Sequence, residues 1–229
     1  MIPHERIYRI MASEYDAMIS RQPDLAPALR EIRTWTGLDV LDLGAGSGRL
    51  SRAIAPEARS LVCTDRSEVM LALLERVLEA SGTPRNWRTV AADHRALPFD
   101  DGVFDVAVAG WTIGYVANAD NPSAASDLDR ILGELRRVLK PGGTIVIAET
   151  MGTGTESPAA PPFLLPYYAA LEQRYGFSHR TFRMDYRFAS PEEAKSHTAF
   201  FFGDALADQI ERHGWSTVPE FASIWWKHF

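Results

Sequence analysis

Short apolar runs alternate with helical patterns through the middle of the sequence, and this alternation constrains the fold more than any other feature. The runs at 40–43, 61–64, 88–91, 104–109 and 144–148 predict strands. Helical patterns lie between them at about 49–55, 67–82 and 124–139. Strands that alternate with helices form βαβ units and a parallel sheet. We therefore expect an α/β fold with a Rossmann-like, doubly wound sheet.

Both ends of the sequence add elements to this sheet. We expect a helix over 6–19, and a second short helix that ends at Trp35. After Thr150 we expect a loop over 151–166, a helix over 167–176 and a strand over 180–188. Ser190 at a cap, followed by Pro and Glu, predicts a further helix with a break near Gly203. The segment 216–226 predicts a last strand, which Pro219 interrupts, so we expect it at an edge of the sheet.

Composition narrows the class of protein. The 229 residues are 46% hydrophobic and 24% charged, which fits one folded domain over 1–229 and excludes a disordered chain. The single cysteine, Cys63, lies in an apolar run and is expected to be a buried, inert thiol. A net charge of −6 argues against nucleic acid as a partner. The start lacks a signal peptide's apolar core and 106–117 is too short to span a bilayer, so we expect a cytoplasmic protein without a membrane partner.

A glycine loop follows the first of the central strands. Its glycines, Gly44, Gly46 and Gly48, fall as G-x-G-x-G, whereas a dinucleotide fingerprint has G-x-G-x-x-G. Asp42 stands two residues before the first glycine, where its carboxylate would oppose a pyrophosphate. The loop therefore suits an uncharged or zwitterionic adenosine ligand better than a nicotinamide dinucleotide, although a simple tight turn has the same pattern.

Acidic residues end the next two strands. Asp65 stands near the offset at which an acid binds both ribose hydroxyls. The alternative is an acid that interacts with the macrodipole of the following helix. Asp93 could accept a hydrogen bond from an adenine amino group, or it could be an ordinary surface acid. Carboxyl ends of parallel strands share one edge, so these acids are expected on one rim.

Four ordered motifs cover about 38–149: VLDLGAGSGRL, CTDRSEVML, AADHRALPFDDGVFDVAVAG and ELRRVLKPGGTIVIAE. They resemble the motifs of class I S-adenosylmethionine-dependent methyltransferases. LPFDDGVFD, LKPGG and the early RIMASEYD are most similar to the small-molecule enzymes of the ubiquinone/menaquinone-biosynthesis type, methyltransferase type 11. The resemblance implies a seven-stranded, mostly parallel sheet with an antiparallel last strand. It also implies a helical N-terminal lid (1–36), a cofactor-binding core (37–150) and a C-terminal acceptor cap (151–229).

The resemblance also implies the cofactor, S-adenosylmethionine, with S-adenosylhomocysteine as product and no metal. The implied cofactor-binding residues are Tyr15, Asp42, Gly44, Ala45, Gly46, Gly48, Asp65, Arg66, Met70, Asp93, His94, Gly110 and Trp111. Asp42 and the glycine loop would surround the methionine part and Asp65 would hold the ribose. Arg66 and Met70 would flank the adenine, whose amino edge Asp93 and His94 would read. Gly110 and Trp111 would lie near the sulfonium, and Tyr15 would be either a lid residue or a core tyrosine.

The acceptor is less constrained. Methyl transfer needs a general base only if the acceptor keeps its proton until the transition state, and no catalytic residue is assigned. Aromatic residues over 161–188 favour an apolar or aromatic small-molecule acceptor. The candidates for its pocket are Tyr115, Tyr168 and His179. The aromatic segment could equally form a dimer interface, so the protein could be a monomer or a homodimer.

Two alternative functions remain. One is a methyltransferase acting on RNA or protein. Methylation of exocyclic base nitrogens is disfavoured, because Gly110-Trp111-Thr112-Ile113 replaces the Asn/Asp-Pro-Pro-aromatic tetrapeptide after the fourth strand. The other is a non-catalytic S-adenosylmethionine-binding module.

Overall fold

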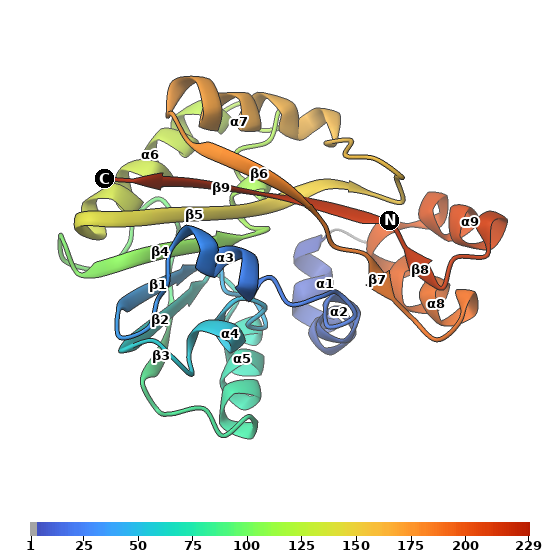
Figure 1. Cartoon of the computed structure of the whole chain (residues 1–229), viewed down its shortest axis with the longest axis horizontal. Helices are drawn as coiled ribbons and strands as arrows, with labels where there is room; N and C mark the ends of the chain where they lie inside the picture. The colour runs from blue at the N-terminus through green and yellow to red at the C-terminus, as the bar shows by residue number, and fades with distance from the viewer. Residues whose placement is uncertain (1–3) are drawn as a thin grey trace.

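The computed structural model describes residues 4–229, and its centre is a seven-stranded sheet in the order β3-β2-β1-β4-β5-β9-β6 (Figure 1). The strands are β1 Asp39–Leu43, β2 Ser60–Asp65, β3 Trp87–Ala91, β4 Phe104–Gly110, β5 Leu139–Thr153, β6 Ser178–Arg183 and β9 Glu220–His228. The first five strands pair in parallel, whereas β9 runs antiparallel to both of its neighbours. This confirms the predicted Rossmann-like sheet and its antiparallel last strand.

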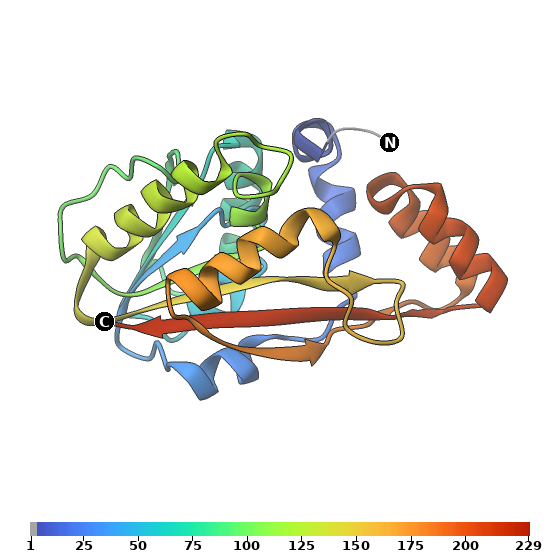
Figure 2. The ribbon, with the colours of Figure 1, turned by 90° about the horizontal axis from the view of Figure 1, so that it is seen from above.

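Helices cover both faces of this sheet. One face carries α3 Ala26–Ile32, α4 Ser51–Ile54 and α5 Glu68–Ala80, and the other carries α6 Ala124–Val138 and α7 Leu165–Ala169, which a π-helical turn at Ala170–Arg174 continues. In Figure 2, α6 and α7 lie above the sheet and α3 lies below it. Successive side chains of a strand point to opposite faces. Val40 of β1 therefore joins one core and Leu41 the other, which explains the continuous apolar character of the buried strands.

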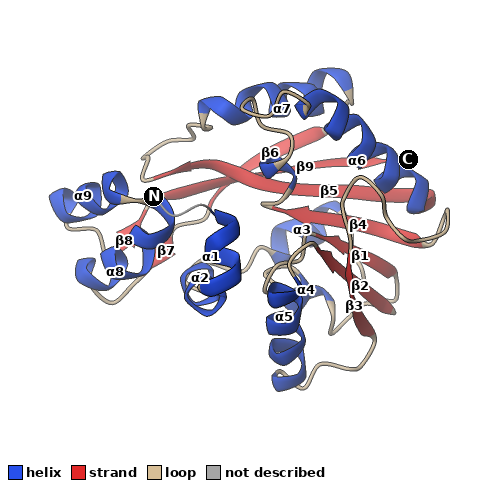
Figure 3. Cartoon of the chain, turned by 180° about the vertical axis from the view of Figure 1, so that it is seen from behind, coloured by secondary structure: helices blue, strands red, loops and turns tan. Residues whose placement is uncertain are grey.

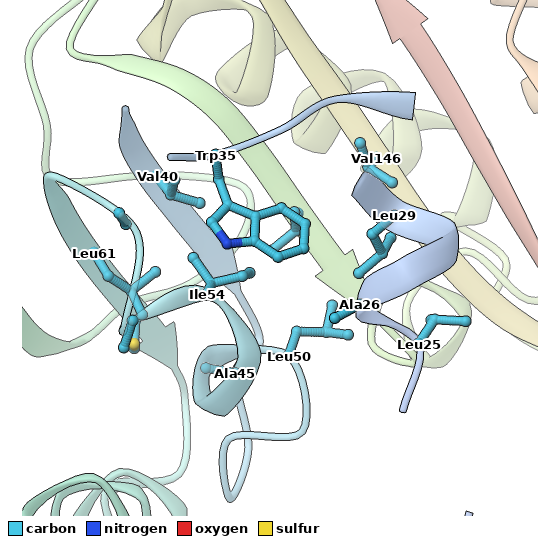
Figure 4. Close-up of a cluster of buried hydrophobic side chains, with 14 of the residues drawn as sticks. Leu25, Ala26, Leu29, Trp35, Val40, Ala45, Leu50, Ile54, Leu61 and Val146 are labelled. Carbon is cyan, nitrogen blue, oxygen red and sulfur yellow. The ribbon is translucent and has the colours of Figure 1, made fainter. Parts of the chain in front are cut away.

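The first core centres on Trp35, whose ring lies among side chains from α3, β1, α4 and β2 (Figure 4). Helix α5 contributes Leu71, Leu74 and Leu78 to the same core. Its start is where the sequence predicts it, because the Ser67 hydroxyl accepts a hydrogen bond from the Met70 amide at 3.3 Å.

A third cluster joins the two ends of the chain. Helices α1 His4–Ile10 and α2 Ala12–Ile19 lie beside α8 Pro191–Phe202 and α9 Asp204–His213, with the two-stranded sheet of β7 Tyr186–Arg187 and β8 Thr217–Val218 (Figures 1 and 3). Met18 and Ile19 of α2 share a core with Leu206 and Ile210 of α9. The predicted start of α8 and the break near Gly203 are confirmed: Ser190 accepts from the Glu193 amide at 3.2 Å and α9 begins at Asp204.

Three predicted boundaries were wrong. The opening helix is broken at Met11 (φ −130°, ψ 33°), and the second helix ends at Ile32 rather than at Trp35. Strand β5 continues through part of the predicted 151–166 loop to Thr153, because it pairs along β9 as far as Glu220.

The predicted strand over 180–188 is two strands, and the predicted edge position of the last strand was wrong. β9 lies between β5 and β6, inside the sheet. The predicted interruption at Pro219 is confirmed, since this residue separates β8 from β9, where the chain passes from the small sheet to the large one. Trp225 and Trp226 point to opposite faces and pack into different cores, with Trp225 fully buried and Trp226 partly so.

Two short 3-10 helices, Ile113–Tyr115 and Pro162–Leu164, complete the elements described. Within residues 4–229, no helix combines the length and the apolar character that a membrane crossing requires. Cys63 is a buried free thiol, as expected.

Candidate functional site

A cleft of about 1260 Å³ lies at the carboxyl ends of β1, β2, β3 and β4, beneath α1 and α2. It is larger than the roughly 300–1000 Å³ of most single-ligand pockets. The structure brings these predicted residues to its wall: Tyr15, Gly44, Ala45, Gly46, Asp65, Arg66, Met70, Asp93, His94, Gly110, Trp111 and Tyr115. Residues from five separate segments of the chain therefore meet where a parallel α/β sheet binds its ligands.

The glycine loop shapes the floor of the cleft. Gly44, Gly46 and Gly48 have φ values of 66°, 54° and 97°, in the left-handed region that glycine adopts without strain. A Cβ at Gly44 would lie 2.6 Å from the Cβ of Thr112. Close packing of the loop against the segment after β4 therefore requires glycine at position 44.

Two predicted cofactor residues, Asp42 and Gly48, are not among the residues that line the cleft. Asp42 is 1% exposed and its carboxylate accepts a hydrogen bond from Ser51 Oγ at 2.5 Å. Burial raises the pKa of this carboxyl to about 7. Gly48 packs against Leu74, with which any Cβ would collide. Both residues support the loop from behind.

Asp65 stands at the end of β2 with both oxygens held in place. Its Oδ2 accepts from the Gly46 amide at 3.0 Å and its Oδ1 from the Ser67 amide at 2.8 Å. Each carboxylate oxygen can accept a second hydrogen bond. The carboxylate is thus oriented by the backbone and keeps acceptor capacity for a vicinal diol.

Asp93 and His94 follow β3 and differ in charge. Arg95 binds both carboxylate oxygens of Asp93, at 2.9 and 2.7 Å, and holds the pKa of that carboxyl well below its usual range. His94 is buried, and burial lowers its pKa, which favours a neutral ring.

The two nitrogens of the His94 ring differ in their partners. Its Nε2 lies 2.9 Å from Thr112 Oγ1, and its buried Nδ1 has no hydrogen-bond partner within residues 4–229. Buried polar atoms are normally paired. A bound ligand could supply the missing partner on this side of the cleft.

Trp111 follows β4 in a strained conformation. It has φ 52°, and within residues 4–229 it is the one non-glycine residue with positive φ. Its amide donates to the Ala148 carbonyl at 2.7 Å, and the Arg49 guanidinium stacks 3.2 Å above the ring centroid. Such strain costs about 1–3 kcal/mol and tends to occur at functional sites.

Tyrosine rings from α1, α2 and the segment after β4 line the cleft. Tyr8 and Tyr15 meet edge to face with centroids 5.1 Å apart, and Phe201 of α8 packs on Tyr15 at 5.3 Å. The Tyr8 and Tyr115 hydroxyls lie 2.6 Å apart. Tyr15 thus lines the cleft, and it also packs against the cluster shared with α8.

Asp16 joins α2 to the glycine loop. Its carboxylate accepts from Ser47 Oγ at 2.7 Å and pairs with Arg52 of α4. In the same region Arg49 donates to Gln22 Oε1, just after α2. The sequence reasoning missed these residues because their partners are distant in the chain.

Tyr8 was also missed, although a signal existed. It stands seven residues before Tyr15, which is two helical turns, and so belongs on the same helical face.

Two acceptor candidates, Tyr168 and His179, do not line this cleft. Tyr168 packs on Trp225 with ring centroids 4.5 Å apart and donates to the Thr150 carbonyl at 2.7 Å. His179 of β6 stacks on the same tryptophan at 5.8 Å. Neither residue lines the cleft, because both pack on Trp225, on the sheet face that α7 covers.

Residues 41–147 match the family model described as a methyltransferase domain. Over these residues the chain is similar to the class I methyltransferases. The cofactor of this family is S-adenosylmethionine. Among residues 4–229, no group of three or more His, Cys, Asp or Glu side chains is arranged to hold a metal.

Curated relatives of this methyltransferase domain include two bacterial proteins. The chain is 35% identical over 156 residues to the demethylmenaquinone methyltransferase of Lactococcus lactis, covering 64% of this chain and 58% of that protein. It is 34% identical over 145 residues to the ubiquinone/menaquinone biosynthesis C-methyltransferase UbiE of Idiomarina loihiensis, covering 62% and 49%. The chain therefore aligns with about half the length of these relatives.

Among solved structures, the YcgJ protein of Bacillus subtilis superposes with a TM-score of 0.61 over 90% of this chain and 97% of that protein. The two sequences are 16% identical, so this similarity concerns the fold.

Proposed function

We propose that this protein transfers a methyl group from S-adenosylmethionine to a small-molecule acceptor and releases S-adenosylhomocysteine. The observation that carries the proposal is the oriented Asp65 carboxylate beside the glycine loop, in one cleft with Trp111. The match to the methyltransferase domain supports it independently. We assign Asp65 to the ribose, the loop from Gly44 to Gly48 to the methionine part, and Gly110 with Trp111 to the sulfonium end.

The adenine would lie between Arg66 and Met70, with its amino edge toward Asp93 and His94. The unpaired His94 Nδ1 supports this placement, because an adenine nitrogen could satisfy it. Asp42 would act from behind the loop, since its carboxylate is buried against Ser51.

S-adenosylmethionine, when bound, supplies a methyl group that is already activated on sulfur. The protein therefore has to position the two substrates and exclude water. Tyr8, Tyr15 and Phe201 would close the cleft. Residues 1–36 would then act as a lid, and the segment 151–229, which contributes Phe201 from α8, would act as a cap. The aromatic faces of Trp111, Tyr8 and Tyr115 favour an aromatic acceptor. From the net charge of −6 we infer that the acceptor is a small molecule rather than a nucleic acid. We also propose that the protein acts in the cytoplasm.

Calorimetry with S-adenosylhomocysteine tests the donor assignment. We expect the full chain to bind it, and Asp65→Asn to weaken binding by about ten-fold or more, because an uncharged side chain makes weaker bonds to the ribose hydroxyls. Asp208→Asn, at an exposed position of α9, is the matched control and should bind like the wild type. An Asp65→Asn variant with wild-type affinity would overturn the assignment of Asp65.

Turnover separates the enzyme from the non-catalytic alternative. S-adenosylhomocysteine release should be followed with a panel of phenol, amine and quinol acceptors. Tight cofactor binding without release from any acceptor class would favour a binding module.

A further inference from the structure

Positive charge gathers in the cleft of a chain whose net charge is −6. The arginines that line the cleft are Arg6, Arg9, Arg49, Arg66, Arg95 and Arg130. The carboxylates that line it are Asp65, Glu68, Asp93 and Asp127. His94 adds no charge when neutral. The wall therefore has more cations than anions, the reverse of the chain as a whole.

Arg95 is the one arginine of this wall that forms ion pairs among the described side chains. It binds Asp93 at 2.7 Å and Asp127 at 3.3 Å, and these three groups together keep a charge of −1. The other five arginines of the wall have no ion pair with a described side chain. The six arginines and four acids give the wall a formal charge of +2.

Arg49 is the most constrained of these cations. It stacks on Trp111 and donates to Gln22, and among the described side chains no carboxylate forms an ion pair with it. The Glu220 carboxyl and the Tyr15 and Tyr186 hydroxyls act on it electrostatically from beyond ion-pair distance. A largely buried cation without a directly paired carboxylate is costly, and an anionic ligand would offset that cost.

Arg9 of α1 and Arg130 of α6 are exposed at the cleft and make no hydrogen bond or ion pair within the described part of the chain. Tyr8 and Tyr115 line the same cleft, and their hydroxyls lie 2.6 Å apart. The cleft therefore combines two guanidinium groups without an ion pair and a pair of tyrosine rings.

We propose that the methyl acceptor is an aromatic molecule with an oxyanion, a carboxylate or a phosphate, that Arg9, Arg49 and Arg130 recognise. Guanidinium groups match the geometry of both oxyanions through paired N–H donors. A neutral acceptor of the same shape would leave these charges unmatched. The inference rests on the proposed function, because that function assigns Asp65, the glycine loop and Trp111 to the donor and leaves Arg9, Arg49 and Arg130 without a role.

Calorimetry on the full chain saturated with S-adenosylhomocysteine tests this site with three probes: 1-naphthoate, 1-naphthyl phosphate and the neutral 1-naphthamide. We expect at least one anion to bind about ten-fold tighter than the amide, as hydrogen bonds to charged groups are the stronger ones. A preference for naphthoate identifies a carboxylate acceptor and a preference for naphthyl phosphate identifies a phosphate acceptor.

The variant Arg9→Gln/Arg130→Gln should reduce that preference to less than about three-fold, because both side chains are exposed and their replacement leaves the core intact. Arg212→Gln, an exposed arginine of α9 outside the cleft, is the matched control and should keep the preference. The same preference, measured in Arg49→Gln, tests the contribution of the buried cation.

The outcomes separate the two proposals. A wild type that does not bind S-adenosylhomocysteine contradicts the proposed function. Normal S-adenosylhomocysteine binding with equal affinity for the three probes, or with no binding of any of them at millimolar concentration, overturns the oxyanion site alone. An equal loss of preference in Arg212→Gln would also overturn it.

Discussion

Replacing Gly44 with alanine should disrupt the junction between the glycine loop and the segment after β4. Gly44 has φ 66°, and an added Cβ would lie 2.6 Å from Thr112 Cβ and closer still to its hydroxyl. That hydroxyl lies 2.9 Å from His94 Nε2. One methyl group at position 44 therefore displaces Thr112 and, through it, the His94 ring.

The structure contains a control with the same backbone strain and no clash. Gly102 also has φ 66°, and a Cβ there would have no atom within 4 Å. Gly102→Ala should cost only the left-handed strain, about 1–2 kcal/mol. Gly44→Ala should cost that strain plus about 1–3 kcal/mol for overpacking. The difference between the two free energies of unfolding isolates the steric part.

Urea unfolding of both variants, followed by circular dichroism, measures the stability difference, and calorimetry with S-adenosylhomocysteine measures the effect on binding. We expect Gly44→Ala to lose about ten-fold in affinity, equivalent to about one hydrogen bond, and Gly102→Ala to bind normally. Equal stability losses in the two variants would refute the role of Thr112 packing. Unchanged affinity in Gly44→Ala would refute its connection to the ligand site.

Three further predictions concern burial and capping. Burial raises the pKa of Glu149 to about 7, whereas the unfolded chain has a pKa of about 4.3 for this group. The contribution of the protonated group to the free energy of unfolding is therefore fully present below pH 4.3 and is lost as the pH rises toward 7. Between pH 5 and 7 this pKa difference lowers the free energy of unfolding by about 3 kcal/mol. In Glu149→Gln, the free energy of unfolding measured in urea should therefore fall less between pH 5 and pH 8 than in the wild type. An unchanged pH dependence would contradict this. Burial also raises the pKa of the Cys63 thiol, so its reaction with a disulfide reagent should follow global unfolding, and rapid labelling of the native protein would disprove it. Ser190→Ala removes the cap that accepts from the Glu193 amide and should cost about 1 kcal/mol in thermal unfolding, which an unchanged melting temperature would exclude.

The centre of the fold could be predicted because its signals are local. Strands buried on both faces are continuous apolar runs, and the runs at 40–43 and 104–109 coincide with β1 and β4. Helix starts with a capping serine, at Ser67 and Ser190, were also predicted correctly.

The elements after Thr150 were harder, since their positions depend on pairing between distant segments. β9 is internal because β6 covers its outer edge, and nothing within 216–226 records that neighbour. Likewise β5 extends to Thr153 because Glu220 pairs with it.

By itself, the sequence determined the order of strands and helices, the glycine loop and the acids at the strand ends, because periodicity and turn chemistry report the local conformation of the chain. Only the tertiary structure decided which of those residues reach the cleft. It buried Asp42 against Ser51, placed Tyr168 and His179 on Trp225, and brought Arg49 onto Trp111. Those contacts join residues far apart in the sequence, and they depend on how helices and sheet pack, which no local pattern encodes.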